Sequence, residues 1–323
     1  MSKSIQFQES TELIRGQEVP IKIVIDLDKP TKVRGIHASF HAAEKTKATY
    51  RVTTSNGKET RTETRTATEY HDIVKESFLL FGSKRMGFFA RLSDSLKTWF
   101  GGGTHEVMEP GPQEFSLNLK IPEDAPASFL GEKCEVFYRL NVQVDLPIRL
   151  NWSKNQSLEV GAKQLPQDIA PVHAVFPDES GRSFWDRTFG KNVILNLAID
   201  RDIHSVGETS MAMLTVETPE PLQLTEISAD LVGTESVTAN GHTDSYGHRY
   251  PLQEIDSPNV ISEESVHEFD IQIPEIDAPF THSGKNFAVK WQIEVQLEVP
   301  WAKNPIISLP IILIPRGRTF PGS

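Results

Sequence analysis

Two histidines and a carboxylate lie close together in the second half of the chain, between Asn240 and His248. They are His242, Asp244 and His248. Imidazole nitrogens and carboxylate oxygens are common ligands of divalent metals, so the three residues form a candidate metal site. A solvated hairpin loop would have the same composition, and that alternative stays open. We expect no cofactor.

A second group of residues could bind a surface rather than a metal. Phe89, Leu92, Leu96 and Trp99 follow the spacing i, i+3, i+7 and i+10, which predicts one apolar stripe of an amphipathic helix over 84–100. Further aromatic and basic residues flank the stripe, and three glycines end the segment at 101–103. The candidate membrane- or partner-binding residues are Lys84, Arg85, Phe88, Phe89, Arg91, Leu92, Leu96, Lys97, Trp99 and Phe100.

Two interpretations of this helix compete. Its apolar stripe can pack on the outer face of the chain's own sheet. Alternatively, bulky aromatic residues beside basic ones suit a membrane interface with anionic headgroups, or a partner surface. Between residues 45 and 97 there are 11 basic and 6 acidic residues, and this local positive charge would assist such contact.

Motifs of common enzyme classes do not occur in the sequence. It has no Gly-x-Ser-x-Gly elbow, phosphate-binding P-loop, dinucleotide fingerprint or His-Glu-x-x-His motif. The carboxylates are scattered without a recognisable acid/base pair. We therefore predict a protein that is not an enzyme and keep a metal-dependent enzyme as the third alternative.

Composition and charge narrow the class further. Of 323 residues, 38% are apolar and 24% charged, which is typical of a globular protein, and the single cysteine, Cys134, excludes an internal disulfide. Neither a secretory signal nor an apolar run of about 18 residues is present, so we expect a cytoplasmic protein, peripheral at a membrane if the helix engages one. Residues 1–160 hold 22 basic and 21 acidic residues, whereas 161–323 hold 11 and 23. Only the first half could face an anionic partner, and no nucleic-acid partner is expected.

The chain contains an internal repeat. Residues 138–147 and 291–300 both alternate apolar and polar side chains over the same length, and both end in proline, at an offset of 153. This alternation predicts a long, half-buried strand in each copy. Two more pairs of segments match in the same order, around Gly16 and Gly207 and around Phe115 and Phe269.

Many short alternating segments separated by Gly, Pro and Asn turns favour β-sandwiches over βαβ units. We predict an all-β chain of two tandem immunoglobulin-like β-sandwich domains, with the short amphipathic helix 84–100 in the first. The first domain covers 1–160, a Pro- and Gly-containing linker 161–190, and the second domain 191–323. Ser55, Asn56 and Gly57 indicate a hairpin turn in a Thr-rich segment of the first domain.

Five ordered blocks of the first half resemble the N-terminal domain of arrestin-fold proteins, particularly the α-arrestins. The second half is similar to the matching C-terminal domain. The blocks are 30–36, 69–72, 111–117, the pair 121–122 and 126–131, and 138–147. In that family a single helix packs on the N-terminal sheet, which supports the first interpretation of 84–100.

The resemblance implies a scaffold or adaptor without catalysis. The chain lacks the Pro-Pro-x-Tyr motifs through which α-arrestins recruit ubiquitin ligases, and it has Asp145-Leu146-Pro147 where family members usually carry Asp-Arg-Pro. We therefore expect a scaffold that binds protein partners through sandwich faces and edges. The alternative is a peripheral membrane module acting through 84–100. The sequence leaves the identity of the partner and the oligomeric state open.

Overall fold

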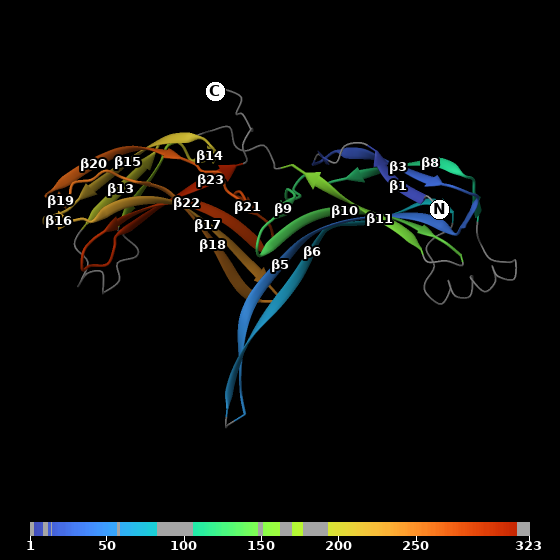
Figure 1. Cartoon of the computed structure of the whole chain (residues 1–323), viewed down its shortest axis with the longest axis horizontal. Coiled ribbons are helices and arrows are strands. Elements are labelled where there is room, and N and C mark those ends of the chain that lie inside the picture. Colours follow the sequence, from blue (N-terminus) through green and yellow to red (C-terminus); the bar gives the residue numbers. More distant parts are fainter. Residues whose placement is uncertain are drawn as a thin grey trace. The chain divides into compact units, whose positions relative to one another are not determined.

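The computed structural model describes residues 3–8, 12–13, 15–56, 59–82, 106–147, 151–161, 170–176 and 193–314 (Figure 1). Within these ranges every regular element is a β-strand, which confirms the predicted all-β class. The predicted helix 84–100 lies outside the described residues.

The first half of the chain contributes eleven strands. They are β1 (Lys3–Gln8), β2 (Glu12–Leu13), β3 (Glu18–Leu27), β4 (Thr31–Val33), β5 (Gly35–Ser55), β6 (Thr60–Gly82), β7 (Glu106–Met108), β8 (Gly111–Lys120), β9 (Phe129–Leu130), β10 (Cys134–Asp145) and β11 (Trp152–Val160).

The second half contributes twelve. They are β12 (Val172–Phe176), β13 (Ile194–Ile199), β14 (Ile203–Ser205), β15 (Thr209–Glu217), β16 (Leu222–Gln223), β17 (Glu226–Ala239), β18 (His242–Glu254), β19 (Val260–Ile261), β20 (Glu264–Gln272), β21 (His282–Ser283), β22 (Phe287–Glu298) and β23 (Ile306–Ile314).

The two halves repeat one sheet topology. In the first half, one sheet has the order β2-β11-β10-β5-β6 with β9 beside β10, and a second has the order β1-β3-β8. In the second half, the order β14-β23-β22-β17-β18 with β21 beside β22 matches the first of these sheets, and β12-β13-β15-β20 forms the other sheet. The short pairs β4-β7 and β16-β19 also correspond. The sequence repeat is therefore a repeat of the fold.

The long strands β10 and β22 are the central elements of the repeat, and each carries one large aromatic side chain into its core. The hydroxyl of Tyr138 donates to the carbonyl of Pro126 at 2.5 Å, and the indole Nε1–H of Trp291 donates to the carbonyl of Pro279 at 2.9 Å. Burial raises the pKa of the Tyr138 hydroxyl well above its usual range, so this group remains a donor. The two donors, Tyr138 and Trp291, are 153 residues apart in the sequence, and so are the two acceptors, Pro126 and Pro279.

Other polar contacts recur at the same offset. The backbone N–H just after each long strand donates to the side-chain amide oxygen of an asparagine five residues further on. A hydroxyl that precedes each long strand accepts from a backbone N–H of β11 in the first half and of β23 in the second. The pairs are Leu146 N with Asn151, Val299 N with Asn304, Val160 N with Ser128, and Leu313 N with Thr281.

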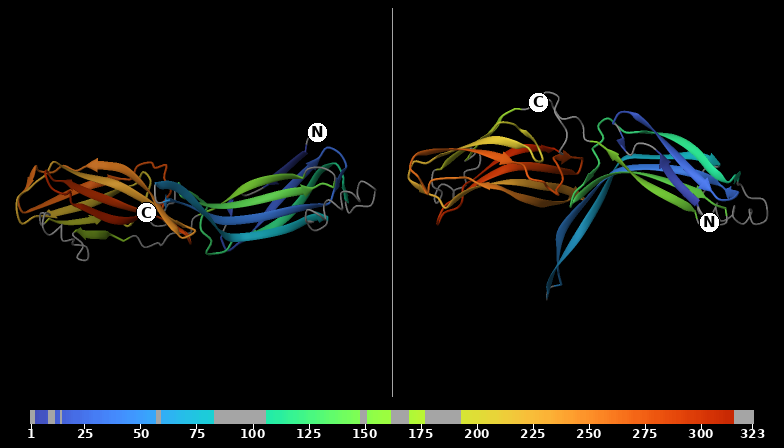
Figure 2. Two further views of the ribbon diagram at one scale, coloured as in Figure 1. Left: turned by 90° about the horizontal axis from the view of Figure 1, so that it is seen from below. Right: turned by 45° about the horizontal axis from the view of Figure 1, so that its top comes forward.

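The core of the second sandwich lies between its two sheets, whose layers are visible in Figure 2. Alternate residues of β22, from Phe287 through Trp291 to Leu297, are at most 5% exposed. From the other sheet, Leu195, Leu197 and Leu214 are fully buried. Period-two alternation on both sheets thus provides the apolar layer that holds them together.

β5 and β6 form the predicted hairpin, and between them the backbone N–H of Glu59 donates to the side chain of Asn56 at 2.9 Å. β10 pairs with β5 only as far as Thr46, so beyond that residue the hairpin continues as a two-stranded ribbon (Figure 1).

The chain divides into two compact units whose boundaries interleave. The first comprises Met1–Thr46, Thr68–Leu130 and Cys134–Lys163. The second comprises Lys47–Ala67, Gly131–Lys133 and Gln164–Ser323. Two short segments that precede residue 160 in the sequence therefore belong to the second unit.

Candidate functional site

The candidate residues of the predicted helix, from Lys84 to Phe100, lie outside the described residues. The three candidate metal ligands are described, and all of them are on β18. Asn240 and Gly241 join β17 to β18 with φ angles of 50° and 78°, as a tight hairpin turn requires.

Each of the three candidate ligands has a different partner within the second unit. The ring of His242 stacks on Tyr50 with centroids 3.6 Å apart, Asp244 accepts from Lys133 at 2.8 Å, and His248 contacts Glu235 at 2.9 Å. Six residues of extended strand span about 20 Å, so His242 and His248 cannot share one ion. Among the described residues, no group of three His, Cys, Asp or Glu side chains could hold a metal.

Asp244 is held as a carboxylate by its neighbours. The ammonium of Lys133 and the backbone N–H of Thr49 both donate to it, each at 2.8 Å. These hydrogen bonds to the charged form lower the pKa of Asp244 to about 2. At neutral pH the contact is therefore a charge-assisted link between three segments of the second unit.

Glu235 lies deeper than Asp244 and is fully buried. Its two oxygens accept from the backbone N–H groups of Glu132 and Lys133 at 3.2 and 3.1 Å, and from His248. Gly131 permits this approach, because a Cβ there would lie 2.5 Å from a Glu235 oxygen. The carboxylate thus fixes the segment 131–133 by its main chain.

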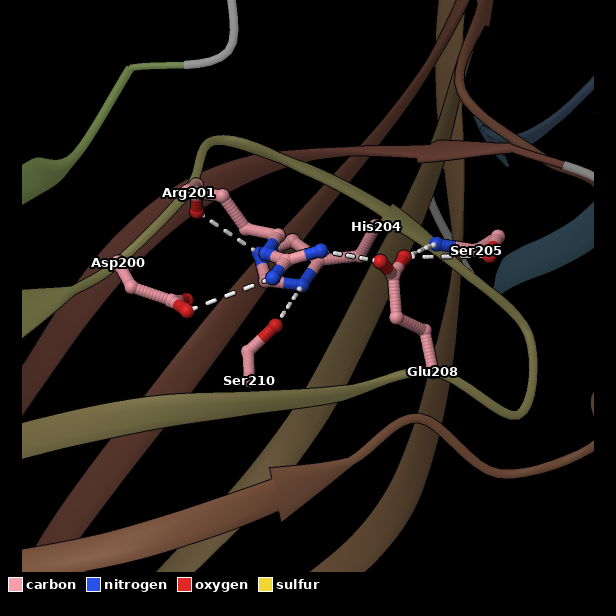
Figure 3. A network of polar contacts seen from close by, with 6 residues as sticks. All are labelled: Asp200, Arg201, His204, Ser205, Glu208 and Ser210. Atoms are coloured by element: carbon pink, nitrogen blue, oxygen red, sulfur yellow. Dashed lines mark hydrogen bonds and ion pairs between the residues drawn. The ribbon is translucent and has the colours of Figure 1, made fainter. Parts of the chain in front are cut away.

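A second polar network, at the β14–β15 turn, superficially resembles a catalytic pair (Figure 3). Ser210 Oγ lies 3.0 Å from His204 Nδ1, and His204 Nε2 lies 2.9 Å from the carbonyl of Arg201. A carbonyl only accepts, so Nε2 carries the proton and the Ser210 hydroxyl donates to Nδ1. Burial lowers the pKa of His204, which keeps the ring neutral.

This arrangement supports the turn and is closed to a substrate. His204 is fully buried and Ser210 is 2% exposed, so the hydroxyl is not accessible for attack. The ring nitrogen that a carboxylate would orient in a catalytic triad faces a carbonyl instead. Glu208 completes the network by pairing with Arg201 and by accepting from the N–H and hydroxyl of Ser205.

Sequence reasoning missed the buried arginine of the first unit. Arg34, 5% exposed, donates to the carbonyls of Leu146 at 3.1 Å and Pro147 at 2.7 Å and lies 3.5 Å from Asp145. Its guanidinium reaches the end of β10, where the sequence lacks the arginine expected next to Asp145. Arg34 lies between β4 and β5, flanked by the buried Val33 and Gly35, and this charged residue beside buried ones was the available signal.

Both halves of the chain match known protein families. Residues 4–164 match the family model described as Arrestin (or S-antigen), N-terminal domain, and residues 190–316 match Arrestin (or S-antigen), C-terminal domain. The chain belongs to the arrestin family. A comparison with curated proteins gave no match. Arrestins are generally scaffolds that bind protein partners without catalysis.

Several of the described strands lie at sheet edges of the arrestin domains. β6 is the last strand of its sheet in the N-terminal domain, and β18 and β20 are the last strands of the two sheets in the C-terminal domain. On β6, Tyr70 is 56% exposed and Leu79 is 45% exposed. No helix in the described part of this arrestin is long and apolar enough to cross a membrane.

Proposed function

We propose that this arrestin is a cytoplasmic, non-enzymatic adaptor that binds protein partners through the faces and edge strands of its two domains. The observation that carries this proposal is β6, a strand of 23 residues that is hydrogen-bonded to β5 on one side and, among the described strands, is the last of its sheet on the other. An exposed edge binds an extended peptide by main-chain hydrogen bonds, and side chains such as Tyr70 then provide selectivity.

The test uses proline at two adjacent positions of β6, with Lys75→Pro and Glu76→Pro made separately in the full chain. Successive N–H groups of a strand point to opposite sides, so one of the two faces the open edge and the other faces β5. We expect one variant to lose its partners in affinity capture from native lysate while keeping its unfolding midpoint. Lys75→Ala is the control. Capture of the same partners by both proline variants would contradict edge binding.

A second candidate function rests on the spacing of Phe89, Leu92, Leu96 and Trp99 with basic residues alongside. We propose that the segment 84–100 binds anionic membrane surfaces as an interfacial helix. The full chain should sediment with phosphatidylserine-containing vesicles at low salt and less so at high salt. Phe89→Ala combined with Trp99→Ala should abolish sedimentation, whereas Val107→Ala, an exposed apolar residue outside the stripe, should not. Unchanged sedimentation of the double variant would exclude this function.

A further inference from the structure

The outer face of the sheet β12-β13-β15-β20 exposes an unusual share of large apolar side chains. The described residues include thirteen large hydrophobic side chains that are exposed, and five of them lie on this face. Val175 and Ile194 lie on β12 and β13, Met211 and Met213 on β15, and Val266 on β20. A strand with one solvated face normally alternates apolar inside and polar outside, and β15 does not.

Carboxylates of β20 and of the end of β15 lie beside the apolar residues in a defined register. Met211 lies opposite Asp270, and Met213 lies opposite Glu268. Two positions beyond Met213 along β15, Thr215 lies opposite Val266, and next to this pair Glu217 lies opposite Glu264. We define the acidic methionine face as Met211, Met213, Val266, Glu217, Glu264, Glu268 and Asp270.

No lysine or arginine within these strands balances the negative charge, because β12, β13, β15 and β20 contain none. Glu264, Glu268 and Asp270 form no ion pair with any described residue of the chain. The corresponding sheet of the N-terminal domain differs, since Lys22 of β3 pairs with Glu114 of β8 at 2.8 Å. By the repeat offset of 191, the position of Lys22 corresponds to Met213.

Protection of an edge strand explains only part of this arrangement. Charged residues on β20 would discourage another strand from pairing there, as edge strands commonly require. The methionines, however, are on β15, which has neighbours on both sides, so edge protection does not account for them. Flexible, polarizable methionines are typical of surfaces that pack against partner helices.

We propose that the acidic methionine face binds a basic amphipathic helix of a partner protein. The apolar side of that helix packs on Met211, Met213 and Val266, and its lysines or arginines face the carboxylates of β20. From Glu264 to Asp270 the strand runs about 20 Å, which is the length of about thirteen helical residues. This inference rests on the proposed adaptor function and specifies one partner class for the C-terminal domain.

The probe is a fluorescein-labelled peptide of sixteen residues with leucine at i, i+3, i+4 and i+7 spacing and lysine on the flanking positions. Its binding to the full chain is followed by fluorescence anisotropy. We expect binding that weakens at least tenfold between 50 and 500 mM NaCl, because the charge pairs are near the surface. The same peptide with glutamate in place of lysine should not bind.

Two double variants test the carboxylates and the methionines of the face separately. Glu268→Lys with Asp270→Lys should weaken binding at least tenfold, and Met211→Thr with Met213→Thr at least fivefold. The matched control is Glu254→Lys with Glu298→Lys, which makes the same charge change at exposed carboxylates of the other sheet and should change binding less than twofold. Unfolding midpoints are measured for all variants, so that a loss of fold is recognised.

Equal weakening by the test and control charge variants, or binding of the glutamate peptide, would overturn the proposal. Its failure is distinguishable from that of the adaptor function. If one β6 proline variant loses its partners while substitutions on the acidic methionine face leave peptide binding unchanged, only this inference fails.

Discussion

At position 233 the absence of a side chain makes room for the ring of Trp291. A Cβ there would lie 2.7 Å from a ring carbon, a distance that real Cβ atoms do not reach. In the first domain the corresponding strand pair places Ala42 opposite Tyr138, where the smaller phenol leaves space for a methyl group. The larger ring, that of Trp291, therefore lies opposite the smaller residue, Gly233, and the smaller ring of Tyr138 lies opposite Ala42.

Gly233→Ala should destabilise the chain by about 2 kcal/mol through overpacking. Adding Trp291→Tyr should recover part of that loss, because the smaller ring makes room for the methyl group. The matched control is Gly247→Ala on the neighbouring strand, where a Cβ meets nothing within 4 Å. Urea unfolding measures all three, and equal midpoints for the 233 and 247 variants would contradict the steric argument.

We expect the buried His204 to make the stability of the second unit depend on pH. Burial lowers its pKa in the folded state, so the unfolded chain binds the proton first as pH falls. Stability should be complete above about pH 6.5 and decrease below it, by at most about 1.4 kcal/mol per pH unit from this group.

His204→Gln should reduce this pH dependence between pH 7.5 and 5.5, measured by urea unfolding. His173→Gln, at an exposed position of β12, serves as the control and should leave the slope unchanged. A histidine whose NMR signal titrates near pH 6.5 in the folded protein, and which disappears in His204→Gln, would refute the assignment.

At the scale of elements, Arg34 connects the start of β5 to the end of β10 through two carbonyls and Asp145. The sequence predicted the long strands, because period-two alternation is local. It did not predict this contact, because Arg34 and Leu146 are 112 residues apart and their proximity depends on the sheet. For the same reason the sequence did not predict the partners of Asp244 and His248. The residue types of Asp244 and His248 suggested a metal site instead.

Arg34→Ala should cost about 3 to 5 kcal/mol, since it removes a buried cation beside Asp145 and two hydrogen bonds to the carbonyls of Leu146 and Pro147. Arg34→Lys should be intermediate, because one ammonium cannot reproduce the forked geometry. Arg65→Ala, which removes an exposed arginine paired with Glu63, should change stability by less than about 0.5 kcal/mol. Denaturant midpoints compare the three, and near-wild-type stability of Arg34→Ala would disprove the role of this contact.

At the scale of the whole molecule, the duplicated sandwich could be predicted from sequence because each copy keeps its own alternation and turns. The interleaving of the units could not, because 47–67 and 131–133 join the second unit through backbone contacts to Glu235 and Asp244. Main-chain donors carry no sequence signal, and only the glycine at 131 marks the close approach.

A fragment of residues 164–323 should therefore be less protected than the same strands in the full chain. Glu235 would lose the two N–H donors of Glu132 and Lys133. Amide hydrogen exchange should show faster exchange in β17 and β18 of the fragment than in the full chain, with β13 and β15 as internal references. Identical protection of β17 and β18 would show that these donors contribute nothing.

The compensating pairs Ala42 with Tyr138 and Gly233 with Trp291 also limit how the two copies can be recombined. A chimera that transplants β22 into the first domain would press an indole against the methyl group of Ala42, whereas β10 in the second domain would leave a void beside Gly233. Two duplicated halves with one topology have thus diverged into non-interchangeable parts, and any exchange of strands must move both members of a pair together.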